Sequence, residues 1–367
     1  MSNATALSLE TSNRTSIHGG NVTLILNPEL CTLQTCDLSL GQLEYLPSVW
    51  GNAVFVGVFG ILLPLHIFLG IKYKTWGFMA GLILGTVLET VGYVVRILLH
   101  YSIFDKDYFI LYLIFLTIAP AFISAGIYIC LSRIVMLYAP QLSRFKPRTY
   151  TICFCTSDFI SLVLQAAGGA IASVATTQDD VDTGTHIMIA GLIFQVVSLA
   201  TFVLLCCDFA LRLHKNRNSW NTQNASIYSS WKFKAFLYSL ALSTLCIIIR
   251  CTFRAIELFD GFTGKLANDE VLYMILEPPM ITIAVVALTI FHPGIGFQGA
   301  WDSAKRSYKG VVADMESSSS YEADLATDRA IFAESGNAEA DDETRTVGGA
   351  TLRGEEGWEM QSLSKAG

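Results

Sequence analysis

The chain has 367 residues, of which 52% are hydrophobic and only 15% are charged, and its formal net charge at pH 7 is −7. The apolar residues form runs long enough to cross a hydrocarbon core of about 30 Å, which excludes an ordinary soluble protein and predicts an all-α, polytopic membrane protein. The net charge indicates little about partners, because much of it comes from an acidic tail after Asp314.

Residues 1–47 are expected to form an extracellular or lumenal tail. Residues 1–30 are rich in Ser, Thr and Asn and lack the basic and apolar regions of a cleaved signal peptide. The tail is therefore expected to stay attached and to cross the membrane with the first span. Its three sequons, the predicted glycosylation sites, begin at Asn3, Asn13 and Asn21. Cys31 and Cys36 share this oxidising side and can pair across a short loop.

A membrane domain is predicted at residues 48–297. Its seven apolar segments cover residues 49–71, 76–99, 108–138, 151–175, 186–211, 234–257 and 271–293. Each segment is long enough to span a bilayer as a helix, so the predicted fold is a seven-transmembrane-helix bundle. Residues 298–367 lose this apolar pattern and are predicted to be a disordered, acidic cytosolic tail.

Lys and Arg residues predict the orientation, because cytosolic loops contain an excess of them. The basic loops contain Lys72, Lys74, Arg144, Lys146, Arg148, Arg212, Lys215, Arg217, Lys232, Lys234, Lys305, Arg306 and Lys309. The opposite loops contain only Lys106 and Lys265. The N-terminus is therefore expected outside and the C-terminus in the cytosol. A further sequon at Asn224 lies in a basic loop and is predicted to stay unglycosylated.

Charged residues inside the spans are the main candidates for function, because each costs roughly 2.5–3.5 kcal/mol at a helix centre on insertion scales. In the segment 76–99, the residues Glu89, Tyr93 and Arg96 lie on one face of a helix. In the segment 234–257, a second face presents Arg250, Arg254 and Glu257.

Glu277 is the only acid in the apolar segment 271–293 and is followed by Pro278 and Pro279, which are expected to kink the helix. Under the predicted orientation, three acids and three bases lie in the outer half of the membrane. They are Glu89, Glu257, Glu277, Arg96, Arg250 and Arg254. One interpretation is an ion-pair network that only holds helices together. The other is that this network also lines a cavity for a ligand headgroup, and the two are compatible.

Further polar residues occupy the fourth and fifth apolar segments. Gln165 and Gln195 lie at middle to outer depth and are counted with the polar network. In the inner half, Asp158 lies at a depth similar to that of Arg133, so these two are predicted to pair. The sequence contains no nucleotide-binding fingerprint, nucleophile elbow or zinc-ligand spacing. We therefore expect no enzyme activity, catalytic residue, metal, cofactor or nucleic-acid partner.

A set of short motifs resembles the fungal lipid-translocating exporter family, the RTA-like group. The motifs are "YLPS", "LETVGYVVR", "APAFISAGIYICLSRIV", "SDFISLVLQAAGGAIAS", "IAGLIFQ", "IIIRCTFRAIELFDGFTGKLANDEVLYMILEPPM" and "FHPG". The polar signature of the family corresponds to Glu89, Gly92, Tyr93, Arg96, Asp158, Gln165, Gln195, Arg250, Arg254, Glu257, Glu270 and Glu277. Glu277 departs from the pattern, because Asp is more often expected there.

The RTA-like group includes aminocholesterol-resistance proteins and sphingoid long-chain-base exporters. The resemblance to it implies a membrane protein that moves amphipathic lipids. The function predicted is a translocator of sphingoid long-chain bases or related toxic amphiphiles, with membrane lipids as partners. The alternative is a seven-span receptor or lipid-stress sensor that transports nothing. The expected location is the plasma membrane, with vacuolar or endoplasmic reticulum membranes as alternatives.

Overall fold

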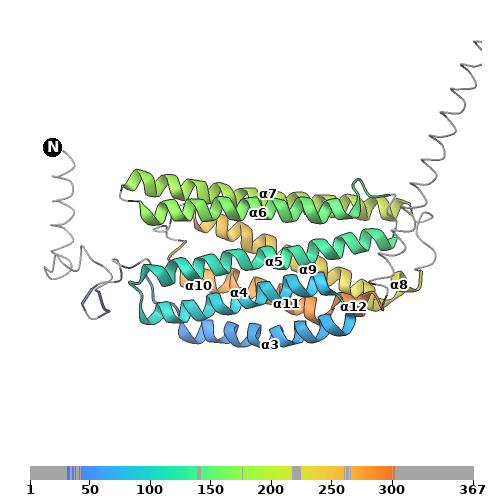
Figure 1. The fold of residues 1–367 in the computed structure, drawn as a ribbon, viewed down its shortest axis with the longest axis horizontal. Helices are drawn as coiled ribbons and strands as arrows, with labels where there is room; N and C mark the ends of the chain where they lie inside the picture. The colour runs from blue at the N-terminus through green and yellow to red at the C-terminus, as the bar shows by residue number, and fades with distance from the viewer. Residues whose placement is uncertain are drawn as a thin grey trace, which may run out of the picture. The chain divides into compact units, whose positions relative to one another are not determined.

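The computed structural model describes residues 31–33, 35, 36, 38, 41, 43–138, 142–175, 177–216, 225–259, 261, 264, 266–299 and 301. In this part of the chain the regular structure is entirely helical, and seven spans are long and apolar enough to cross a membrane (Figure 1). The predicted seven-helix fold is therefore confirmed. The sequons at Asn3, Asn13, Asn21 and Asn224 and the tail from residue 302 onward lie outside the described residues.

Six spans are single helices, and the seventh is broken. The single helices are α3 (Val49–Tyr73), α4 (Trp76–Tyr101), α5 (Lys106–Tyr138), α6 (Pro147–Val174), α7 (Gln178–Lys215) and α9 (Trp231–Glu257). A short helix, α8 (Ala225–Ser229), precedes α9. The seventh span consists of α10 (Glu270–Leu276), α11 (Pro278–Ile290) and α12 (Pro293–Gly296).

The helix α7 begins eight residues before the predicted segment 186–211. Hydropathy marks only the apolar part of a helix, whereas α7 starts in polar sequence with Thr177 as its N-cap. Asp179 and Asp180 in its first turn interact favourably with the helix dipole. The extra turns therefore follow from capping rather than from hydrophobicity.

Successive spans run in alternate directions, so the helix ends gather at two ends of the bundle (Figure 1). We call one the disulfide end; it contains Val49, Tyr101, Lys106, Val174, Gln178, Glu257 and Glu270. The other is the basic end, and the described basic residues there are Lys72, Lys74, Arg144, Lys146, Arg148, Arg212, Lys215, Lys232 and Lys234. Among the described lysines and arginines outside the buried charged network, Lys106 alone lies at the disulfide end.

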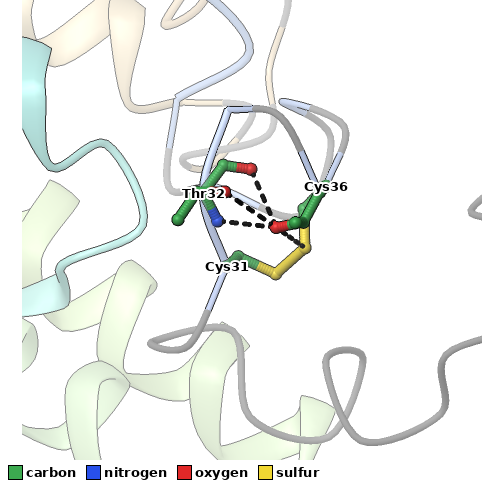
Figure 2. The surroundings of a disulfide bond; sticks show 4 residues. Cys31, Thr32 and Cys36 are labelled. Carbon is green, nitrogen blue, oxygen red and sulfur yellow. Dashed lines mark hydrogen bonds between the residues drawn. A yellow bond between two sulfur atoms is a disulfide. The ribbon is translucent and has the colours of Figure 1, made fainter.

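The segment before α3 contains the disulfide that gives this end its name. Cys31 and Cys36 are joined with an S–S distance of 2.01 Å, as expected from the sequence (Figure 2). The amide of Cys36 donates to the carbonyl of Thr32 at 3.0 Å, which closes the short loop. The Cys31 side chain is buried against the hydrophobic core, so the loop packs onto the bundle.

Small residues allow two helix pairs to approach closely, as is common in membranes. A Cβ atom added at Gly81 of α4 would lie 2.8 Å from the carbonyl oxygen of Phe122 in α5. A Cβ atom at Gly168 of α6 would lie 2.5 Å from the carbonyl oxygen of Gly184 in α7. The pairs α4–α5 and α6–α7 therefore pack backbone to backbone, which fixes the depth of the polar residues that they contain.

Candidate functional site: a buried polar network

Helix α9 and the broken seventh span bring four of the predicted charged residues together. Arg250 and Glu277 form an ion pair with 2.8 Å between Nη2 and Oε1. Arg254 pairs with Glu257, with 2.8 Å between Nη1 and Oε2, and its Nη1 is 3.9 Å from Oε2 of Glu277. All four side chains are buried. Glu277 therefore joins the two arginines of α9 to the seventh span.

A break in the seventh span positions Glu277. Pro278 and Pro279 have no amide hydrogen, so neither can continue the hydrogen-bonding pattern of α10. α10 accordingly ends at Leu276, α11 begins at Pro278, and Glu277 occupies the junction. The kink predicted from the two prolines is thus where the shared carboxylate lies.

A second proline supplies an acceptor to Arg250. Pro120 lies inside α5 and cannot donate to the carbonyl of Leu116, four residues before it. Nη2 of Arg250 donates to that carbonyl oxygen at 2.6 Å. Arg250 is therefore held between Glu277 and the α5 backbone. This contact was not predicted from the sequence, although Pro120 in the motif "APAF" indicates that a carbonyl within the span needs another donor.

Arg96 lies among three tyrosines and forms no salt bridge within the described part of the chain, although Glu257 interacts with it electrostatically. Its Nη2 donates to the Tyr45 hydroxyl at 2.6 Å, and its guanidinium carbon is 3.8 Å from the ring centroid of Tyr273 and 5.0 Å from that of Tyr112. Such contacts stabilise a desolvated cation through the negative face of each ring. The Nε and Nη1 atoms of Arg96 have no hydrogen-bond partner among the described residues.

Tyr45 precedes α3 and covers the disulfide end of this network. Burial raises the pKa of its hydroxyl above the usual 10, although Arg96 opposes that shift, so Tyr45 is neutral at physiological pH. Neighbouring backbone groups fasten the segment: the amide of Ser48 donates to Oε1 of Glu270 at 2.6 Å, and the carbonyl of Pro47 lies 2.8 Å from Nδ1 of His100. None of the three tyrosines around Arg96 was among the predicted site residues.

Glu89 differs from the other buried acids. Its side chain is 0% exposed, and neither carboxylate oxygen has a hydrogen-bond partner among the described residues. Arg250 and Glu277 interact with it electrostatically, and the Tyr93 hydroxyl is its polar side-chain neighbour but lies outside ordinary hydrogen-bond geometry. The Tyr93 ring is stacked on Phe59 of α3, with ring centroids 5.9 Å apart. Glu89 and Arg96 are two turns apart on α4, so they do not pair with each other.

Gln165 and Gln195 form a separate polar contact between α6 and α7. Nε2 of Gln165 donates to Oε1 of Gln195 at 3.1 Å, and both side chains are buried. No hydrogen bond or ion pair within the described part of the chain connects them to Arg250 or Glu277. The structure therefore divides the predicted network, and these two glutamines link a different helix pair.

The predicted pair of Arg133 and Asp158 was wrong. Oδ2 of Asp158 accepts from the Tyr128 hydroxyl at 2.9 Å. Arg133 donates through Nη1 to the carbonyl of Trp301 at 3.0 Å, and its guanidinium lies 5.0 Å from the indole ring. Arg133 is five residues beyond Tyr128 on α5, about 7.5 Å farther along the helix. It therefore reaches the basic end, while Asp158 is satisfied deeper in the bundle.

An apolar groove lies between α3 and α10, with a volume of about 360 Å³. Its lining consists of Ser48, Gly51, Phe55, Glu270, Val271, Met274 and Ile275. Phe55 also contacts the polar core, since its ring centroid lies 5.4 Å from that of Tyr93. The groove therefore has a carboxylate at the disulfide end and an aromatic wall toward Tyr93.

The described residues contain no group of three or more His, Cys, Asp and Glu side chains that could hold a metal ion. What the site offers is a buried cluster of acids and arginines, a tyrosine-lined cation and an adjoining apolar groove. Phe55 lies between the groove and the buried cluster.

The family model for RTA1-like proteins matches residues 82–300, which include the six predicted charged residues and also Tyr93, Gln165 and Gln195. The chain belongs to the RTA1-like family. This confirms the resemblance to the RTA-like group that the motifs predicted, and it supports an integral membrane protein.

Relatives within the RTA1-like family include three proteins of Saccharomyces cerevisiae. The sphingoid long-chain base transporter RSB1 (strain Lalvin EC1118 / Prise de mousse) is 34% identical over 282 residues, which cover 69% of this chain and 73% of the relative. Protein RTA1 is 28% identical and covers 57% of this chain and 64% of its own. Protoporphyrin uptake protein 1 is 27% identical, with 56% and 65% covered. No solved structure matches the chain significantly.

Proposed function

We propose that this protein translocates amphipathic lipids with a cationic headgroup across the membrane, and that sphingoid long-chain bases are its substrates. The observation that carries the proposal is Glu89, a fully buried carboxylate without a hydrogen-bond partner among the described residues. The RSB1 relative, which is named a sphingoid long-chain base transporter, supports the same substrate class.

The ammonium group of a sphingoid base matches the carboxylate of Glu89. An ammonium has three donors and needs charged acceptors once it leaves water, and charge-assisted hydrogen bonds are the strongest available. Arg250 interacts with this carboxylate electrostatically but forms no salt bridge with it among the described residues, since its Nη2 contacts Glu277 and the carbonyl of Leu116. Glu89 is thus the acid in the cluster that is free to accept a ligand.

The groove between α3 and α10 suits the remainder of the lipid. Val271, Met274 and Ile275 offer an apolar surface to an alkyl chain, and Glu270 lies at the end where a headgroup would approach. Phe55 separates the groove from Tyr93, which faces Glu89. A lipid could therefore enter sideways from the bilayer by displacing one aromatic side chain, while its chain stays in contact with apolar surface.

The proposal is tested with purified protein in vesicles that contain a fluorescent sphingoid base. Movement between leaflets is measured by quenching the outer leaflet, with protein-free vesicles as the baseline. We expect the wild type to move the base, the variant Glu89→Gln to lose most of this movement, and the variant Asp208→Asn to retain it. Asp208 is an acid at the basic end that pairs with Arg144 and Arg212, far from the groove.

A wild-type protein that moves nothing above the baseline contradicts the proposal. If that protein nevertheless binds the base, the sensor alternative is favoured. If both variants move the base as fast as the wild type, translocation stands but Glu89 is not the headgroup acceptor.

A further inference from the structure

One acid and one base of the network, Glu89 and Arg96, take part in no ion pair among the described residues. Glu277 is paired with Arg250, and Glu257 is paired with Arg254. Arg96 is accommodated by tyrosines, which are neutral. Glu89 therefore has no ion-pair partner in the part of the chain that the structure describes, although the cluster contains equal numbers of acids and bases.

A charged Glu89 would be costly in the absence of ligand. An unpaired carboxylate away from water costs several kcal/mol, whereas a protonated carboxyl is neutral. Three titratable or charged groups face it: Tyr93 from α4 itself, Arg250 from α9 and Glu277 from the α10–α11 junction. From α3, the rings of Phe55 and Phe59 contact Tyr93, and α5 contributes the Leu116 carbonyl that Arg250 already occupies.

We propose that Glu89 holds a proton in the empty protein and exchanges it for the ammonium group of the lipid. The O–H bond of the carboxyl breaks, the proton passes to solvent, and the resulting carboxylate accepts hydrogen bonds from the ammonium. No covalent bond to the lipid forms. The inference rests on the proposed function, because it assumes that a cationic headgroup is the ligand.

The exchange keeps the charge of the site constant. With Glu89 protonated, three arginines and two carboxylates remain, and the cluster has a net charge of plus one. After the exchange the ligand adds one positive charge and Glu89 one negative charge, so the total is unchanged. The buried environment therefore never has to accommodate an additional charge, and a proton moving one way can drive a cationic lipid the other way.

The test counts protons released on binding. Wild-type protein in lipid nanodiscs is titrated with a short-chain sphingoid base at neutral pH, in buffers of different ionisation enthalpy, so that the dependence of the binding heat on the buffer gives the proton count. We expect about one proton released per base bound, and a binding affinity that falls about tenfold per unit as the pH is lowered. The N-acetylated base, which has no ammonium, should release none.

Variants locate the proton. Glu89→Asp keeps a carboxyl and should release a proton, Asp208→Asn should behave as the wild type, and Glu89→Gln should release none if it still binds. If Glu89→Gln does not bind, the wild-type count decides alone. A wild type that binds without releasing a proton, or a Glu89→Gln protein that still releases one, overturns the exchange but leaves lipid translocation intact. A wild type that does not bind the base contradicts the proposed function itself.

Discussion

Glu277 and Glu89 belong to the same network, but Glu277 is ion-paired and Glu89 is not. Glu277 contacts both Arg250 and Arg254, whereas Glu89 has no hydrogen-bond partner among the described residues. Removing one member of a buried ion pair leaves the other member charged and unpaired, whereas replacing a carboxyl that takes part in no ion pair does not. The change in the free energy of unfolding on substitution can therefore distinguish the roles of the two acids.

Glu277→Gln should lower the free energy of unfolding by about 3–5 kcal/mol, because Arg250 is left buried without its counter-charge. Glu89→Gln should change it by much less, because a neutral amide replaces a carboxyl that has no counter-charge to lose. Both are measured by denaturant titration of the purified protein in mixed micelles. Equal destabilisation by the two substitutions would show that Glu89 has a structural partner and would contradict our description of the site.

Tyr45→Phe should destabilise the protein by about 1–3 kcal/mol, because Arg96 loses the hydroxyl acceptor while its Nε and Nη1 atoms already lack partners. Tyr101→Phe is the matched control at the same end, since Tyr101 is 71% exposed. The same micelle titration measures both. If both substitutions have the same small effect, the contact between Tyr45 and Arg96 does not stabilise the fold.

At the residue scale, the sequence predicted which side chains are charged and buried but not which ones pair. The free-energy cost of placing a charged side chain inside a membrane span identifies Glu89, Arg96, Arg250 and Glu277 as candidates, because charges there are rare and mostly functional. Arg254 and Glu257 pair within one helix, but the pairing of Arg250 with Glu277 depends on offsets of a few ångströms between helices, which no local sequence pattern contains. The Tyr45 contact was missed for the same reason: it joins a segment before the first span to the second span.

At the scale of elements, apolar length predicted the seven spans, and the proline pair predicted the break at Glu277. The polar start of α7 was missed because hydropathy does not register N-caps. The acceptor for Arg250 was missed because Pro120 acts on a neighbouring helix: it frees a carbonyl in α5, and the donor comes from α9. Local sequence rules identify the carbonyl that lacks a backbone donor, but not the side chain that supplies one.

Backbone contact between α6 and α7 gives a prediction at this scale. Gly168→Ala should destabilise the protein by about 1–3 kcal/mol, because the added methyl would lie 2.5 Å from the carbonyl oxygen of Gly184 and from the amide of Met188. Gly57→Ala is the control, since a Cβ atom there meets nothing within 4 Å. Denaturant titration compares them. A Gly168→Ala protein as stable as the control would mean that the two helices are not closely packed.

For the whole molecule, we propose that the basic end faces the cytosol and the disulfide end faces outward. The described lysines and arginines of the loops are concentrated at one end, and the disulfide lies at the other, where an oxidising compartment favours it. The polar network then lies nearer to the outer surface.

Glycan occupancy tests this orientation. Mass spectrometry of the protein from eukaryotic cells should find glycan at one or more of Asn3, Asn13 and Asn21 and none at Asn224. Replacing each asparagine in turn by glutamine assigns any shift in mass. Glycan at Asn224 would contradict the proposed orientation, because it would place a basic loop on the outer side of the membrane.

The central claim is that the buried network recognises a cationic headgroup. Its most direct test measures the movement of two labelled lipids through the same reconstituted vesicles: a sphingoid base and its N-acetylated form, which differ in the ammonium charge. Our account predicts that the wild type moves the charged base at least about tenfold faster, a difference of roughly 1.4 kcal/mol in barrier height, and that Glu89→Gln removes this preference. Equal rates for the two lipids in the wild type would contradict it.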